Sequence, residues 1–394
     1  MLADLPRTIQ APGTENQILT CHRSPLAALT GLRFFAASYV IVFHTRLSTM
    51  FYNRDLKAAG NFISNGYLAV PLFFMLSGFI LTYNYRRHVE TLNHALRFWE
   101  ARFARIWPAY IFSLICSSFP LSHIPSLPMA LRVVFMVQSW DPFHPEYAGL
   151  WNFVCWTLSV EAFFYLVFPL MQFCLERVRP AQMAVLGLCV ISIAFFFNTP
   201  YHNYTLRYSG PWFYIPAPLI HLPEFVTGVI LGNLYLQGNG RLDWFRFPRR
   251  KWGVGSTISA SPMAGEGARF PILTFLGLIS SFFILSVPHD RWEALVLPTF
   301  GVLMFGLATE SSALSRLLST RILLLGGEIS YAMYLLRTPI QQWVFAISAP
   351  QLRQLAQALY LPLGLIPLSL LSFYFIEGPS RKRIRRFFAM LQKG

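Results

Sequence analysis

The stretch LAALTGLRFFAASYVIVFHT, residues 26–45, decides the architecture of this chain. It is apolar over the length of a membrane-spanning helix, yet it contains Arg33 and His44. Their separation of about three helical turns places both side chains on nearly the same face, roughly 16 Å apart along the axis. Ionisable groups inside a membrane span are costly and usually mark a functional site in the protein interior. The stretch therefore predicts a membrane helix with a cation near one end and a titratable base near the other.

Composition and hydropathy identify the class of protein. Charged residues make up only 12% of the 394 residues, against about 25% in soluble domains, and 55% are hydrophobic. Apolar runs of membrane-span length recur along the whole chain. We therefore predict an all-α polytopic membrane protein with about ten transmembrane helices. The predicted spans are residues 28–49, 66–84, 106–122, 156–175, 181–197, 217–236, 271–287, 293–308, 322–347 and 358–376.

The distribution of Lys and Arg predicts the orientation of these spans. With the N-terminus inside, the inner segments carry 23 of the 32 basic residues and the outer loops carry six. Because cytoplasmic loops of membrane proteins are enriched in Lys and Arg, both termini should be cytoplasmic. The same bias accounts for the net charge of +15, so we expect no nucleic-acid partner.

The sequence divides into three parts. A polar cytoplasmic segment covers residues 1–26, a membrane domain covers 27–377, and a basic cytoplasmic tail covers 378–394. The inner loop at about 237–270 is rich in Gly, Ser and Ala after a basic cluster, which predicts a flexible linker. We expect that cluster and the tail to lie against anionic lipid headgroups. The five cysteines lack metal-ligand spacing, so we expect no metal site.

Two carboxylates are expected at a depth close to that of His44. Glu161 enters the fourth predicted span about one turn below the outer surface, and Glu224 enters the sixth at a similar depth. A His–Glu pair is a common general base, because the acid orients the imidazole and stabilises its charged form. We therefore treat His44, Arg33, Glu161 and Glu224 as candidate catalytic residues. A structural role for a buried histidine is the alternative.

Two further polar clusters are candidates for binding. Arg102 and Arg105 lie three residues apart at the cytoplasmic start of the third predicted span, where they suit a phosphate group. Positive-inside charge explains them equally well. The ninth predicted span carries a polar stripe, which either binds substrate or makes interhelical hydrogen bonds. Its candidate substrate-binding residues are Ser330, Tyr331, Tyr334 and Arg337.

Seven segments, taken in order, resemble the acyltransferase 3 family of membrane-bound O-acyltransferases. This family includes bacterial peptidoglycan and lipopolysaccharide O-acetylases and exopolysaccharide acyltransferases. The resemblance runs from about residue 26 to 386. This chain has Arg337 where the family often has histidine, and Ala162 where it often has a second acid. The segments are LTGLRFFAASYVIVFH, GYLAVPLFFMLSGF, RFARIWP, WTLSVEAFFY, LPEFVTG, GEISYAMYL and EGPSRKRIR.

The resemblance implies a membrane enzyme, expected in the bacterial inner membrane. Its donor would be a cytoplasmic acyl-CoA, most simply acetyl-CoA, bound as a substrate with no tightly held cofactor. The resemblance makes His44 and Arg33 the leading active-site candidates and places Arg102 and Arg105 at the donor. We expect His44 to act as the general base and Arg33 to take part in donor binding as well. The acceptor would be a hydroxyl of a cell-surface glycan or a lipid-linked sugar precursor. A transporter of a lipid-linked sugar or small acid is the rival interpretation, because intramembrane Arg, His and Glu suit it too.

Overall fold

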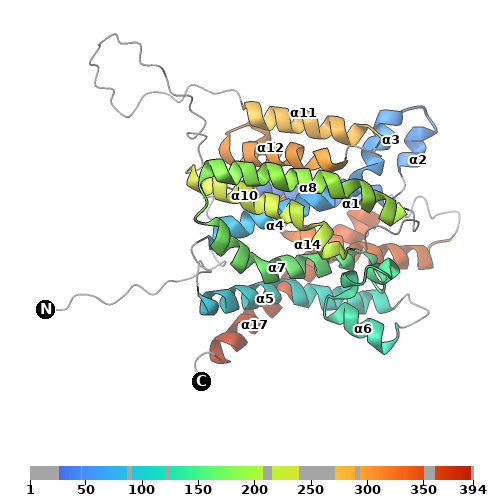
Figure 1. The fold of residues 1–394 in the computed structure, drawn as a ribbon. Coiled ribbons are helices and arrows are strands. Elements are labelled where there is room, and N and C mark those ends of the chain that lie inside the picture. Colours follow the sequence, from blue (N-terminus) through green and yellow to red (C-terminus); the bar gives the residue numbers. More distant parts are fainter. Residues whose placement is uncertain are drawn as a thin grey trace, which may run out of the picture.

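The structure is a computed structural model that describes residues 26–45, 47–86, 91–119, 125–206, 215–238, 271–288, 293–349 and 360–391. Over these ranges the chain forms helices joined by turns, with no β-strand, which confirms the predicted all-α class. The long helices lie side by side in one bundle (Figure 1). The short helices α2, α3 and α6 gather at one end of the bundle, and α17 lies at the other.

Each of the ten predicted spans overlaps a helix. Two π-helical segments, Leu361–Leu365 and Ser372–Glu377, interrupt the tenth. The helix bounds are α1 Ala27–Phe43, α2 Ser48–Tyr52, α3 Lys57–Ser64, α4 Ala69–Tyr85, α5 Leu92–Ser118, α6 Leu127–Val134, α7 Trp156–Leu175, α8 Pro180–Leu206, α9 Ala217–Ile220, α10 Leu222–Gln237, α11 Ile272–Ser286, α12 Val296–Thr309, α13 Ala313–Leu318, α14 Arg321–Ile347, α16 Ile366–Leu371 and α17 Gly378–Leu391.

Only some of these helices are as long as a membrane span requires. In the described ranges, four helical segments are long and apolar enough to cross a membrane: Gly66–Tyr85, Phe153–Leu175, Ala217–Gln237 and Pro362–Phe388. The count of ten spans and the cytoplasmic termini therefore stay predictions. The predicted N-terminal segment up to residue 25, and the predicted flexible loop from residue 239 to 270, lie outside the described residues.

Helix α5 is longer than the sequence predicts. It begins at Leu92 instead of residue 106, and the side chain of Thr91 caps it by accepting a hydrogen bond from the His94 N–H at 3.3 Å. The first turns are polar and basic, so hydropathy alone could not distinguish them from a loop. Consequently Arg102 and Arg105 lie in the middle of a long helix and not at its start.

A close backbone contact holds α1 against α14. A Cβ built on Gly327 of α14 would stand 2.0 Å from the carbonyl oxygen of Thr30 in α1, a distance that no real side chain tolerates. Small residues allow helices to approach in this way. Further along both helices, the charge of Arg337 acts on His44. The two helices therefore run side by side in the same direction.

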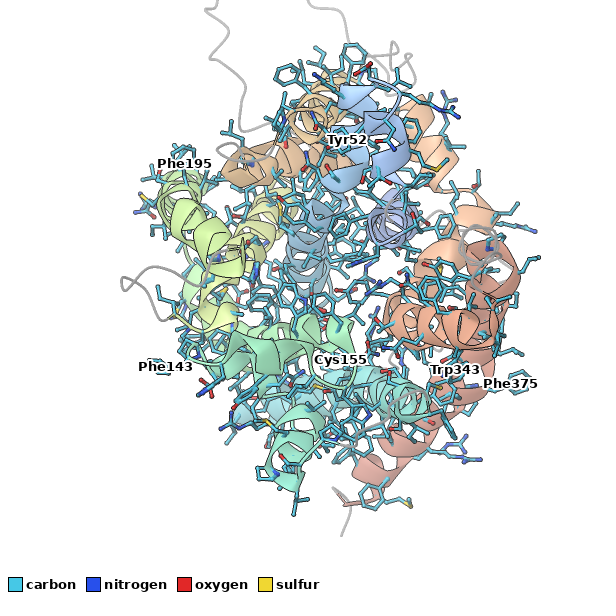
Figure 2. The ribbon with its side chains drawn as sticks, turned by 90° about the vertical axis from the view of Figure 1, so that its right-hand side faces the viewer. Tyr52, Phe143, Cys155, Phe195, Trp343 and Phe375 are labelled. Carbon is cyan, nitrogen blue, oxygen red and sulfur yellow. The ribbon has the colours of Figure 1, made fainter. Side chains whose placement is uncertain are left out.

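The perimeter and the centre of the bundle differ in character. Figure 2 looks along the bundle from the end that carries α6. Phe195 and Phe375 project outward and are 50% and 73% exposed, whereas Cys155 lies at the centre and is fully buried. Large apolar side chains around the perimeter suit a surface that faces lipid. Polar groups that matter for function are therefore expected between the helices.

Candidate active site

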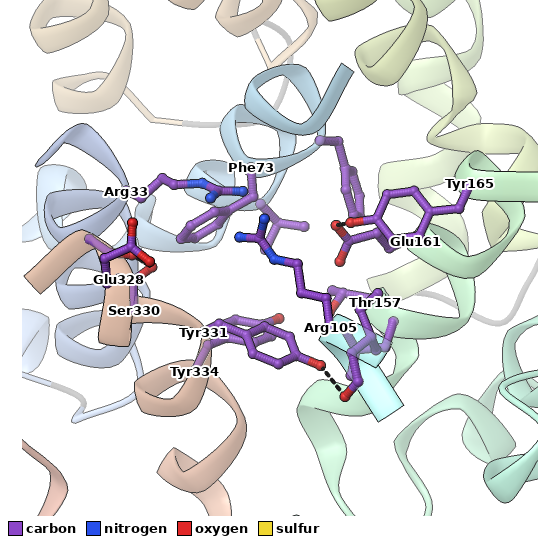
Figure 3. A pocket seen from close by; sticks show the side chains of 15 residues that line it. Arg33, Phe73, Arg105, Thr157, Glu161, Tyr165, Glu328, Ser330, Tyr331 and Tyr334 are labelled. Atoms are coloured by element: carbon purple, nitrogen blue, oxygen red, sulfur yellow. Dashed lines mark hydrogen bonds between the residues drawn. The ribbon is translucent and has the colours of Figure 1, made fainter. Parts of the chain in front are cut away.

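Helices α1, α4, α5, α7 and α14 surround an open cavity, whose empty space, with the adjoining solvent included, is about 740 Å³. Four helices contribute ionisable side chains to its wall: Arg33, Arg105, Glu161 and Glu328 (Figure 3). An enclosed apolar space with a few convergent polar groups is the usual form of a small-molecule site. The lining is Arg33, Val70, Phe73, Phe74, Arg105, Ile106, Thr157, Leu158, Glu161, Tyr165, Gly327, Glu328, Ser330, Tyr331 and Tyr334.

Two guanidinium groups face this cavity without a bonded partner. Arg33 and Arg105 are half-buried, and neither makes a hydrogen bond or an ion pair with any residue in the described ranges. The carboxylates of Glu161 and Glu328 act on both through space. In Figure 3, Arg105 reaches into the middle of the cavity, between Arg33 and Glu161. Because a guanidinium forms strong charge-assisted bonds to oxyanions, the cavity suits a ligand with a negatively charged oxygen.

Glu161 is held at the wall by its neighbours. Its carboxylate accepts a hydrogen bond from the Tyr165 hydroxyl, one turn along α7, and another from the Ser77 hydroxyl of α4 at 3.3 Å. The backbone carbonyl of Tyr165 accepts in turn from the indole of Trp99 at 2.9 Å. Sequence reasoning missed Tyr165, although its spacing of four residues from Glu161 places the two on one helix face.

Arg102 and Arg105 have different surroundings, although the sequence predicts that they act together. Arg105 lines the cavity, whereas Arg102 is only 9% exposed and is absent from the lining. Arg102 donates to the Tyr85 hydroxyl at 2.9 Å, and its guanidinium lies 5.2 and 5.8 Å from the ring centres of Tyr85 and Phe98. Such cation–π contacts hold a buried arginine in place. Arg102 is therefore packed into the wall beside the cavity.

His44 lies at the opposite end of α1 from Arg33 and outside the cavity lining. It is the C-cap residue of α1, it is half-buried, and its ring centre lies 6.2 Å from that of Phe153. No hydrogen bond joins its imidazole to a carboxylate within the described part of the chain. The charged side chain that acts on it is Arg337 of α14.

Arg337 is fixed beside His44 by its own helix. It is 4% exposed and donates to the Thr338 hydroxyl at 3.0 Å and to the Gln341 side-chain oxygen at 3.3 Å. Tyr334, one turn earlier on α14, lines the cavity. The polar stripe predicted for the ninth span thus leads from the cavity to His44.

The other residues of the stripe make hydrogen bonds that hold the helices, line the cavity, or do both. Tyr331 lines the cavity and donates its hydroxyl to the Ile106 carbonyl at 3.0 Å, which ties α14 to α5. The Ser330 hydroxyl donates to the Gly327 carbonyl at 2.7 Å, within its own helix. Tyr334 also lines the cavity. Interhelical hydrogen bonding is therefore seen for Tyr331, and substrate binding by the stripe stays a prediction.

Glu224 pairs with a histidine other than the one expected. Its carboxylate lies 3.1 Å from the imidazole of His221, and both side chains are buried. The ring of His221 packs between Phe74 and Trp156, with ring centres 5.3 Å away on each side. No hydrogen bond joins Glu224 or Glu161 to His44 among the described residues, so the structure does not form the His–Glu pair that the sequence suggests. The spacing of three residues in HLPE could have identified His221.

Comparison with known proteins identifies the family. Residues 26–377 match a family model described as an acyltransferase domain, that of the acyltransferase 3 family. The chain belongs to this family. It is 28% identical over 395 residues to O-acetyltransferase OatA of Staphylococcus aureus, which covers 93% of this chain and 59% of OatA. It is 29% identical over 231 residues to acyltransferase MdmB of Streptomyces mycarofaciens, which covers 54% of this chain and 58% of MdmB.

The family assignment confirms the resemblance seen in the sequence. The chain therefore carries the domain of an acyltransferase family, and four of its described helical segments are long and apolar enough to cross a membrane. The chain spans less than two thirds of the length of both relatives. No solved structure matches it. Its donor, its acceptor and the roles of individual residues are therefore matters for proposal.

Proposed function

We propose that this enzyme moves an acyl group, most simply acetyl, from cytoplasmic acyl-CoA to a hydroxyl of a cell-surface glycan or lipid-linked sugar precursor. The bacterial inner membrane would be its location. The observation that carries the proposal is the interhelical cavity into which Arg33 and Arg105 direct guanidiniums that have no bonded partner among the described residues. The name of the relative OatA, an O-acetyltransferase, supports an O-linked acetyl product.

The donor would occupy the cavity through its charged and polar parts. Arg33 and Arg105 would form charge-assisted hydrogen bonds to the phosphate oxygens of the donor. Tyr331 and Tyr334 would line the path of the acyl arm toward the end of α1.

The transfer would take place at the His44 end of this path. The acceptor hydroxyl loses its proton to the imidazole of His44 while its oxygen attacks the thioester carbon. The C–S bond then breaks, the electron pair leaves with the sulfur, and the imidazolium returns the proton to the CoA thiolate. The reaction therefore needs no external oxidant, reductant or net proton.

The carboxylates would support this chemistry from a distance. Glu161, held by Tyr165 and Ser77, would balance the cations of the cavity and orient Tyr165. Glu224 would act through His221 on the wall formed by Phe74, and so would be a positioning residue. Arg337 would position His44 or the acceptor.

A transfer assay tests the proposal. The purified protein in lipid nanodiscs is given acetyl-CoA labelled in its acetyl group, together with a cell-envelope glycan fraction. We expect acceptor-dependent release of CoA thiol and an alkali-labile label on the glycan. A transporter would instead move labelled sugar across a sealed vesicle without releasing thiol. That result would overturn the proposal.

A further inference from the structure

Helix α17 turns one of its cations toward the protein. Arg381 is partly exposed, as are residues 377, 384 and 388 at helical spacing, so these positions form the packed face of α17. The other basic residues near it point away. Those exposed side chains are Lys382, Arg383, Arg385 and Arg386.

The packed face of α17 lies against α5, the helix that carries the arginine pair. Both α17 and the π-helical segment Ser372–Glu377 contact α5, and the two helices meet obliquely in Figure 1. The charge of Arg381 interacts most strongly with Arg105, and further with Arg385 and Arg102. A cation from the far end of the chain is therefore placed with the cations of the cavity wall.

The carboxylate of Glu377 attracts Arg105 and Arg381 through space, but among the described residues no carboxylate forms an ion pair with either, and the three arginines leave a net positive charge. Arg381 makes no hydrogen bond or ion pair with any residue that the structure describes. Glu377 lies one turn before it and keeps a buried carboxylate oxygen without a partner in the described ranges. Like charges held together at a partly buried place repel one another, and an anion between them removes that repulsion.

We propose that Arg381 forms, with Arg105 and Arg102, a phosphate-binding site beside the cavity, where α17 contacts α5, and that this site holds a phosphate group of the donor. The inference rests on the proposed function, because acyl-CoA supplies the phosphate. Arg105 reaches the site from the cavity, and Arg381 closes it from the tail. Arg102, fixed by Tyr85 and Phe98, supports the site from within the wall.

A phosphate could also come from the headgroup of an anionic lipid, since basic helices at a membrane surface attract such lipids. The two sources differ in what they require. A headgroup site works only in a membrane that contains anionic lipid, and it does not distinguish donors with and without phosphate. A donor site works in any membrane and depends on the phosphates of CoA.

The test compares affinities in nanodiscs of purely zwitterionic lipid and of mixed anionic lipid. Binding of CoA and of phosphate-free S-acetyl-pantetheine is measured by calorimetry for the wild type, Arg381→Gln, Arg381→Lys and the exposed control Arg383→Gln. We expect Arg381→Gln to weaken CoA binding about 10- to 100-fold in both membranes, the effect of losing a charge-assisted hydrogen bond. Arg381→Lys should retain part of the affinity. Arg383→Gln should match the wild type, and S-acetyl-pantetheine should not distinguish any of the proteins.

Three results would overturn the site. Unchanged CoA affinity in Arg381→Gln would remove Arg381 from donor binding. Weakening confined to the anionic membrane would assign Arg381 to a lipid headgroup. Equal weakening for S-acetyl-pantetheine would show general damage to the cavity. The donor assignment itself fails separately, if the wild type binds no CoA in either membrane.

Discussion

Gly327 of α14 and Thr30 of α1 meet so closely that a Cβ on the glycine would stand 2.0 Å from the threonine carbonyl oxygen. The contact lies beside Glu328 and one turn from Arg33, both of which line the cavity. The separation of the helices that carry these two charges is therefore set by the absence of a side chain at residue 327. The geometry of the cavity depends directly on this packing.

Substitution of Gly327 by Ala should separate α1 from α14. The added methyl group meets backbone, which cannot move away cheaply, so we expect destabilisation of roughly 1–3 kcal/mol and weaker donor binding. The measurements are the melting temperature in detergent and CoA affinity. Gly187→Ala in α8 is the matched control, because its Cβ would meet only a side-chain carbon at 3.6 Å. An unchanged melting temperature for Gly327→Ala would contradict the packing described here.

Arg105→Ala and Arg102→Ala should fail in different ways. Arg105 faces the cavity with no bonded partner in the part of the chain that the structure describes, so its loss should raise the KM for acyl-CoA about tenfold or more while the fold stays intact. Arg102 is packed against Tyr85 and Phe98, so its loss should lower the melting temperature as well. Steady-state kinetics and thermal melting, measured on both variants, separate the two effects. Identical profiles for the two variants would argue against the different roles assigned to them.

The sequence was sufficient for the helices and for part of the site. All ten predicted spans overlap helices. They could be predicted from apolar runs, because a segment that crosses lipid must be long and apolar. Arg33 and Glu161 could be selected because charge inside such a segment is expensive, and Arg105 because its spacing from Arg102 suits a phosphate group. The start of α5 could not be predicted in this way, since its first turns are polar and a cap at Thr91 fixes where the helix begins.

Side-chain partners across helices could not be predicted, because they depend on helix rotation. Arg102 and Arg105 differ by about 60° around the helix axis, enough to place one against Tyr85 and the other in the cavity. Glu224 has a partner three residues away in His221, and that local contact takes precedence over the expected long-range one with His44. The sequence predicts how deep Glu224 lies in the membrane, but depth alone does not decide whether it contacts His221 or His44.

The segment between α5 and α7, which includes α6, should depend on pH through Asp141. Burial alone would raise the pKa of this carboxyl, but hydrogen bonds from Arg132 at 3.0 Å, from His144 at 3.2 Å and from the Phe143 N–H at 3.1 Å hold the pKa below its usual range. Because the pKa of Asp141 is lower in the folded state, its carboxylate stabilises the loop fully at pH values above the unfolded pKa of about 3.9. This stabilisation is lost as the pH falls through the folded pKa.

Asp141→Asn isolates this contribution. At pH 7 the variant should show faster amide exchange than the wild type in residues 132–147, because the charge-assisted bonds are weakened. The difference should shrink as the pH falls below about 4, where the wild-type carboxyl also becomes protonated. Exchange is compared at equal pH, so the intrinsic rate cancels. A difference that persists undiminished in acid would show that the charge of Asp141 is not what holds the loop.

His44 gives the sharpest test of the mechanism. Glutamine at this position keeps a hydrogen-bond donor and acceptor but cannot take up a proton at neutral pH. If His44 is the general base, His44→Gln should insert and bind CoA normally yet lose acyl transfer by at least ~10²-fold. If His44 only packs against Phe153, the same variant should retain most of its activity. His144→Gln, on the exposed segment between α6 and α7, is the matched control and should transfer at the wild-type rate. Near-normal glycan acylation by His44→Gln, both in cells and in nanodiscs, would remove His44 as the base and make Glu161, already at the wall of the cavity, the next candidate.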